Sequence, residues 1–103
     1  MKVIHPKEFK AERAWGSLPI TEMNGIGIKL HWTDKPYIWH VNDGEEIFVV
    51  LDGQVDMYYK KNDKENCVKL IKGDIFFAEI NDAHKAHPIG EARILVIEKM
   101  GSK

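Results

Sequence analysis

The sequence predicts a single all-β domain with little or no helix, built from short strands that form a sandwich or a barrel. Apolar and polar residues alternate along most of the 103 residues, which is the pattern of half-buried strands. Turn signals interrupt these stretches roughly every eight to twelve residues, as they do in sandwiches and barrels. A chain of this length has room for one hydrophobic core, so we expect one domain.

Seven stretches have the composition of strands. They are residues 26–32, 37–42, 47–51, 55–59, 67–71, 75–78 and 93–99. In the first of them, the apolar side chains are expected to face the core, and Lys29 and His31 to face solvent. Residues 47–51 are apolar on both faces, which suggests a strand buried between the core and either another layer or a second subunit.

The remaining segments are assigned by composition. Residues 60–66 are strongly charged and are expected to form a loop. Residues 6–14 are either a short helix or an arm that lies on the domain. We therefore expect residues 1–23 to be an N-terminal arm or first strands, packed on a barrel formed by residues 24–103.

The dipeptide Asp52-Gly53 is the strongest local signal, because Asp-Gly between two β-prone stretches favours a two-residue hairpin turn. If the flanking strands pair through this turn, Glu46 lies opposite Tyr59. The same register sets Val50 opposite Val55 and Phe48 opposite Met57. Since Val55, Met57 and Tyr59 are the less polar set of the second strand, we expect this face, with Glu46, to point into the domain.

A second turn precedes Glu46. A three-residue loop, 43–45, would set Asn42 opposite Glu46. His40 and Asn42 then share the inward face with Glu46, since residues two apart on a strand point the same way. A two-residue loop would bring Glu45 inward instead. We prefer the longer loop because it agrees with the Asp-Gly register.

Two segments carry the functional signal through their spacing. His40 is followed by Glu46 and, six residues after that, by Gly53, while Gly73 precedes His84 further along the chain. These segments resemble the paired motifs of the cupin superfamily, and the resemblance runs from residue 24 to residue 98. It is closest to small single-domain members described as mannose-6-phosphate-isomerase-like. The resemblance implies a jelly-roll barrel, the double-stranded β-helix, with a metal site inside.

The resemblance implies that His40, Glu46 and His84 are the metal ligands. Asn42 stands where a second histidine is usual and is carried over as a weak additional oxygen ligand. Two imidazoles and one carboxylate with open positions suit Fe, Zn, Ni or Mn. The alternative is a site without metal, in which the histidines are core residues that hydrogen-bond with Glu46.

Three further residues are candidates for proton transfer: Glu79, Tyr59 and His87. Glu79 stands where the cupin motif usually has proline, and it is either a base or substrate contact or a solvated strand end. His87 follows His84 by three residues and would point the other way on a regular strand, unless a bulge brings it back. The expected substrate pocket is lined by Phe48, Met57, Tyr59 and Phe77.

Composition argues against several classes of partner. The 15 Lys and Arg and the 16 Asp and Glu give a net charge of -1, so we expect neither nucleic acid nor an anionic membrane as partner. The single cysteine, Cys67, cannot form an intrachain disulfide. The N-terminus lacks a continuous apolar segment of the signal-peptide type, and no stretch is long enough to span a bilayer. We expect a cytoplasmic protein.

Three functions are compatible with these observations. The first is a metal-dependent enzyme that acts on a small polar molecule, sugar-like or an organic acid, as an isomerase or epimerase or as an oxygenase. The second is a non-catalytic module that binds a small ligand, and the third is a metal-free structural barrel. The apolar stretch 47–51 also predicts a homodimer packed through one sheet face, because that side would otherwise expose apolar surface.

Overall fold

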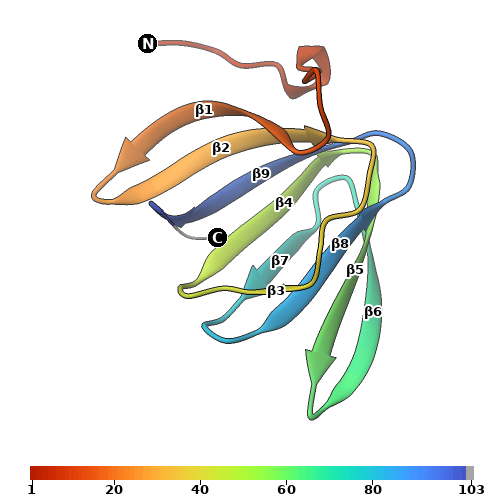
Figure 1. The fold of residues 1–103 in the computed structure, drawn as a ribbon. Coiled ribbons are helices and arrows are strands. Elements are labelled where there is room, and N and C mark those ends of the chain that lie inside the picture. The colour runs from red at the N-terminus through yellow and green to blue at the C-terminus, as the bar shows by residue number, and fades with distance from the viewer. Residues whose placement is uncertain (102–103) are drawn as a thin grey trace.

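The chain folds into two antiparallel sheets that face one another, as the computed structural model of residues 1–101 shows (Figure 1). The elements are η1 (Pro6–Glu8), β1 (Gly16–Met23), β2 (Ile26–Thr33), β3 (His40–Val41), β4 (Glu46–Asp52), β5 (Gln54–Lys61), β6 (Lys64–Ile71), β7 (Ile75–Ala78), β8 (Ala83–Pro88) and β9 (Ala92–Lys99). The strand order is β1-β2-β9-β4-β7 in one sheet and β3-β8-β5-β6 in the other. The predicted all-β class is therefore confirmed. Residues 102 and 103, which the predicted barrel range includes, lie outside the described residues.

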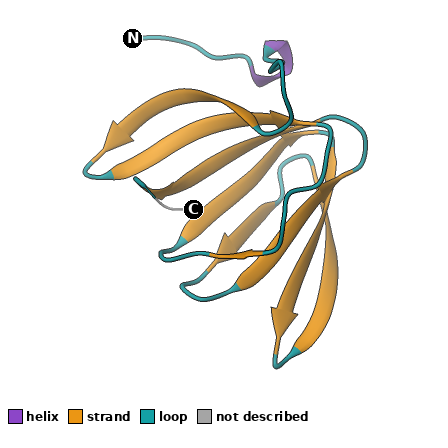
Figure 2. Cartoon of the chain, viewed as in Figure 1, coloured by secondary structure: helices purple, strands orange, loops and turns teal. Residues whose placement is uncertain are grey.

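Strands and turns account for nearly the whole chain (Figure 2). The 3-10 turn η1 is the one helical element among residues 1–101. It belongs to the segment that the sequence assigned either to a short helix or to an arm. No helix in the described part of the chain is long and apolar enough to cross a membrane.

The core lies between the two sheets, because alternate residues of the central strands point inward. It consists of Phe48, Val50, Val55, Met57, Leu70, Ala86, Ala92, Ile94 and Val96. Burial of a large apolar side chain stabilises a fold by roughly 1.5–3 kcal/mol, so this alternation fixes which way the strands that supply these core residues face. In β4 the alternation turns Glu46 inward together with Phe48 and Val50, while Glu45 is exposed.

Strand β2 faces opposite to the prediction. Its partner residues on β9 show that Leu30 and Trp32 lie on the outer face of the five-stranded sheet, opposite Leu95 and Arg93. Both are nevertheless buried, because the N-terminal segment covers this end of the sheet. The guanidinium Nε of Arg93 donates to the Phe9 carbonyl oxygen at 2.8 Å. The prediction that Lys29 and His31 face solvent is therefore wrong: the inner face of β2 carries them.

Both predicted hairpin registers are also wrong. β4 pairs with β7 and β9, whereas β5 pairs with β6 and β8, so Glu46 does not lie opposite Tyr59. Asp52-Gly53 is a corner where the chain passes from one sheet to the other. β3 likewise pairs with β8 rather than β4, and this places His40 opposite His84. The same turn chemistry serves a corner and a hairpin, so the local signal could not decide between them.

The charged segment 60–66 is not a loop. β5 and β6 run through it and meet at Asn62-Asp63, where φ is 54° and 61°. Two consecutive residues with positive φ make a primed hairpin turn, in which Asn and Asp are favoured. The segment was predicted as a loop because its charged side chains are solvated, although its backbone forms a hairpin.

Candidate metal centre

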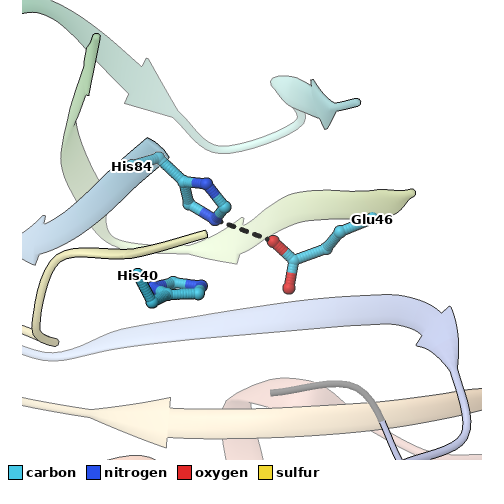
Figure 3. A group of neighbouring side chains, drawn as sticks. All are labelled: His40, Glu46 and His84. Atoms are coloured by element: carbon cyan, nitrogen blue, oxygen red, sulfur yellow. Dashed lines mark hydrogen bonds and ion pairs between the residues drawn. The ribbon is translucent and has the colours of Figure 1, made fainter. Parts of the chain in front are cut away.

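Three strands bring together the ligand set that the sequence predicted. His40 on β3 and His84 on β8 are cross-strand neighbours, with ring centroids 4.2 Å apart. Glu46 begins β4 in the opposite sheet and points at them across the interior (Figure 3). One nitrogen of each ring and one carboxylate oxygen all lie within 4.8 Å of one another. A single ion could contact all three.

The site is largely shielded from solvent. His84 is 2% exposed and Glu46 is 7% exposed, whereas His40 is half-buried. His84 Nε2 lies 3.1 Å from Glu46 Oε1. Burial also lowers the pKa of His40, with a smaller contribution from the neighbouring His84 ring, so this imidazole is held in the neutral form that metal binding requires.

The backbone fixes the tautomers of both histidines. His40 Nδ1 lies 3.2 Å from the Ile38 carbonyl oxygen, and His84 Nδ1 lies 3.3 Å from the Asp82 carbonyl oxygen. A carbonyl oxygen can only accept, so each Nδ1 donates its hydrogen. Nε2 is then the nitrogen of each ring that can bind an ion at the centre, which is the orientation found around metal-ligating histidines. In the structure His84 Nε2 donates to the Glu46 carboxylate, and a metal ion would take the place of that hydrogen.

A second carboxyl group, that of Glu98, lies beside Glu46. The two residues are opposite one another on β9 and β4, within hydrogen-bonding range. Burial and the Glu46 carboxylate raise the pKa of Glu98 to about 7. Burial alone would raise the pKa of Glu46 too, but hydrogen bonds from His84 and Glu98 outweigh it and lower that pKa. Glu46 therefore carries the negative charge, and Glu98 holds the proton.

Asn42 is the unsatisfied member of the site. It is 2% exposed and near enough to Glu46 to help lower its pKa. Neither its Nδ2 nor its Oδ1, however, makes a hydrogen bond of normal geometry with the described residues. Burying an amide group without hydrogen-bond partners costs free energy. A metal ion that binds oxygen ligands, or a water bound to that ion, would give the Asn42 amide a partner.

These observations together fit a divalent metal ion. Two imidazoles that each leave Nε2 for an ion, together with one ionised carboxylate, form the 2-His-1-carboxylate set, which suits Fe(II) and also Zn, Ni and Mn. The orphaned Asn42 amide adds a polar group at the same place. The donor set does not distinguish among these metals.

Comparison with solved structures gives the fold its name. A cupin-2 domain protein from Shewanella frigidimarina superposes with a TM-score of 0.75 at 26% identity, over 86% of this chain and 84% of that one. A cupin superfamily protein from Desulfitobacterium hafniense gives 0.79 at 13% identity, over 96% and 92%. The chain has the cupin fold. A hydroquinone 1,2-dioxygenase in complex with Cd2+ and 4-hydroxybenzonitrile gives 0.74 at 13% identity, over 87% and 67%.

No protein-family model matches the sequence, and no curated protein matches it significantly. The predicted resemblance to cupins is confirmed as a fold by these structures. The finer resemblance to mannose-6-phosphate-isomerase-like proteins is not confirmed.

His40, Glu46 and His84, which we call the triad, lie at the wall of a cavity in the cupin barrel. The cavity has a volume of about 150 Å³. It is lined by Trp15, His31, Tyr37, His40, Glu46, Phe48, His84, Ala86, Val96 and Glu98. Of the four residues expected to line a substrate pocket, Phe48 is among them. Met57 is fully buried in the core instead.

The other predicted residues lie elsewhere in the cupin barrel. Tyr59, Glu79 and Phe77 line a second cavity of about 280 Å³ between β5 and β7. His87 points away from His84, as the alternation of β8 requires, and its ring packs 6.2 Å from that of Tyr58. None of the three candidates for proton transfer lines the cavity that holds the triad.

Six cavity residues were not predicted: the two aliphatic residues Ala86 and Val96, and the aromatic or ionisable residues Trp15, His31, Tyr37 and Glu98. His31 was assigned to solvent because the apolar residues of β2 were taken to be core. Glu98 had a usable signal, since it alternates with Val96 and Ile94 on β9 and so shares their inward face. Trp15 and Tyr37 lie outside regular strands, where periodicity carries no information.

Proposed function

We propose that this protein is a metal-dependent cupin that binds, and with its metal transforms, a small molecule carrying an oxygen ligand. The observation that carries the proposal is the convergence of His40, Glu46 and His84, with Nδ1 of each ring held by a backbone carbonyl so that Nε2 is the nitrogen left for an ion. A bound divalent ion would supply Lewis acidity and open positions for an oxygen of the ligand. Asn42 completes the ligand shell either directly or through water.

The residues of the chain supply the rest of the proposed chemistry. The buried Glu46 and His84 form the inner wall of the cavity, where reduced contact with water strengthens electrostatic interactions. Glu98 lies on the same wall as Glu46, and in the metal-free protein its pKa is raised to about 7 by burial and by that carboxylate. We assign proton transfer to Glu98 because it is the carboxyl group of the cavity that is left over once Glu46 holds the ion. This role replaces those first assigned to Glu79, Tyr59 and His87, which do not reach the cavity.

The test is metal content. Protein purified without an affinity tag is expected to contain close to one divalent ion per chain by mass spectrometry, and His40→Ala and His84→Ala each to lose it. His87→Ala is the matched control, because His87 lies on the same strand as His84 but on its opposite face. Equal trace metal in all four proteins would contradict the proposal.

A non-catalytic module, binding a ligand or acting as a structural barrel with an empty site, is the alternative. It is supported by Asn42, which offers at best a weak oxygen ligand where a second histidine is usual in cupins. Thermal-shift screening against sugars, sugar phosphates and organic acids separates the two. Ligand-dependent stabilisation together with turnover supports the enzyme, and stabilisation without turnover supports the module.

We also propose that two copies pack through the outer face of the five-stranded sheet. Ile75 and Phe77 of β7 are 65% and 50% exposed. They lie opposite Val49 and Ile47 of β4, which are half-buried. A contiguous apolar face of this kind usually marks an interface.

A further inference from the structure

The cavity is walled mainly by planar rings. Besides those of His40 and His84, it is lined by the rings of Trp15, His31, Tyr37 and Phe48. Trp15 and Tyr37 meet edge to face with centroids 5.3 Å apart, and Tyr37 meets His40 in the same way at 5.1 Å. A series of rings in contact therefore runs from the N-terminal segment to the triad.

Trp15 is held in a strained conformation. Its φ is 60°, in the left-handed region that a bulky aromatic residue rarely adopts. The next residue, Gly16, is tightly enclosed, since a Cβ there would collide with the Cβ of Ala11. Strained residues persist where the surrounding structure over-determines them, and they cluster at ligand sites. In this backbone conformation, Trp15 places its indole at the wall of the cavity.

His31 presents a hydrogen-bond acceptor to the cavity. Its Nδ1 lies 3.2 Å from the carbonyl oxygen of Trp15, which can only accept, so Nδ1 carries the hydrogen. Burial lowers the pKa of His31 and keeps the ring neutral. Nε2 is then left as an acceptor. The same hydrogen bond therefore links the strained Trp15 to His31 and sets the orientation of the histidine ring.

Size and polarity restrict the ligand further. A cavity of about 150 Å³ matches an apolar cavity known to bind benzene, so it accommodates about one ring. Beyond the triad, the lining residues with hydrogen-bonding side chains are His31, Glu98, Tyr37 and Trp15, whose indole N–H has no partner among the described residues. A sugar, with a hydroxyl on nearly every carbon, would leave several of them buried without partners.

We infer that the cavity selects a small planar ligand of the hydroxylated aromatic acid class, whose hydroxyl donates to His31 and whose ring packs against Trp15. The specificity-determining residues are His31 and Trp15. One contact, that of the ligand's carboxylate with the triad, rests on the proposed function. The hydroxyl and ring contacts depend only on the residues of the cavity.

The test uses benzoate, its 2-, 3- and 4-hydroxy derivatives and mannose 6-phosphate as probes, titrated by calorimetry into Zn2+-loaded and metal-free protein. At least one hydroxybenzoate is expected to bind about tenfold or more tightly than benzoate. His31→Phe keeps a ring of similar size and should bring the ratio of hydroxybenzoate to benzoate affinity close to one, with the zinc content of wild type. Trp15→Leu should weaken all aromatic probes alike.

Two controls keep the outcomes separable. His5→Phe, at an exposed position before the arm, should behave as wild type, and His31→Gln, which retains an acceptor, should keep part of the preference if the Phe variant fails to fold. Equal affinity for benzoate and every hydroxybenzoate overturns the inference, as does tighter binding of mannose 6-phosphate or no binding of any aromatic probe. If wild-type protein does not bind zinc but still prefers a hydroxybenzoate to benzoate, the proposed metal-dependent function is overturned and this inference is not.

Discussion

At the level of single residues, the centre contains two carboxyl groups where the metal set needs one. Glu46 and Glu98 are neighbours across β4 and β9, and two adjacent carboxylates cannot both ionise cheaply away from water. The protein without metal therefore retains a proton, which resides on Glu98 because hydrogen bonds from His84 favour the charged form of Glu46. A divalent cation would remove the conflict.

This shared proton predicts how stability depends on pH. The pKa of Glu98 is raised from 4.5 to about 7 in the folded protein, so between these values the folded state binds more protons than the unfolded state. Its contribution to stability is full below pH 4.5 and is lost as pH rises through about 7. In chelator-treated protein, the free energy of unfolding of Glu98→Gln relative to that of wild type should therefore rise by roughly 1–3 kcal/mol as the pH is raised from 5 to 8.

Urea unfolding at several pH values measures this difference. Because other groups also contribute to the pH dependence of both proteins, the informative quantity is the difference between the variant and wild type at each pH. Glu22→Gln, at an exposed position on β1 of the same sheet, is the control. A constant difference across the range would show that Glu98 has no raised pKa.

At the level of elements, the sequence predicted most of the central strands but not which strands pair. It missed β8, it assigned residues 60–66 to a loop, and of the predicted strand 37–42 only residues 40 and 41 are in a strand. Residues 47–51, 75–78 and 93–99 lie within β4, β7 and β9, because alternation is a local property. Pairing is not local. The inward direction of Glu46 was correct even though its predicted partner was wrong, since the alternation along β4 determines direction whichever strand lies beside it.

The part of the candidate site that the sequence missed has a specific cause. The outer face of β2 is more apolar than its inner face, so a rule that places apolar side chains in the core turned the strand over. Leu30 and Trp32 are buried on that outer face by the N-terminal segment, and His31 is left to line the cavity. Only the tertiary position of the segment shows this.

The corner at Gly53 gives the prediction at this scale. Its φ is 84°, and a Cβ there would collide with the Glu91 carbonyl oxygen. Gly53→Ala should lower the free energy of unfolding by about 2–4 kcal/mol, the sum of left-handed strain and overpacking. Gly90→Ala separates the two terms, because Gly90 has φ 74° but no atom within 4 Å of an added Cβ, and should cost about 1 kcal/mol. Equal costs would rule out the steric contribution.

At the level of the whole molecule, the two faces of the five-stranded sheet have different tasks. The inner face supplies the core, Glu46 and the cavity wall, whereas the outer face is covered only in part. The N-terminal segment covers the end near Arg93 and Trp32, where Lys10 also lies 5.5 Å above the Trp32 ring. The β7 edge, with Ile75 and Phe77, has no such cover among the described residues.

This uncovered edge leads to a prediction about assembly. If a second copy packs there, the protein should sediment as a dimer of the 11.9 kDa chain at micromolar concentration. Phe77→Lys should shift it to monomer without loss of folded structure, because burying a lysine in an apolar interface is costly whereas the same side chain is tolerated in water. Ile89→Lys, at a 51% exposed position in the turn between β8 and β9, should leave the dimer intact. A wild-type protein that sediments as monomer at this concentration would exclude the proposed interface, and dissociation by both variants would point to a nonspecific effect of added charge.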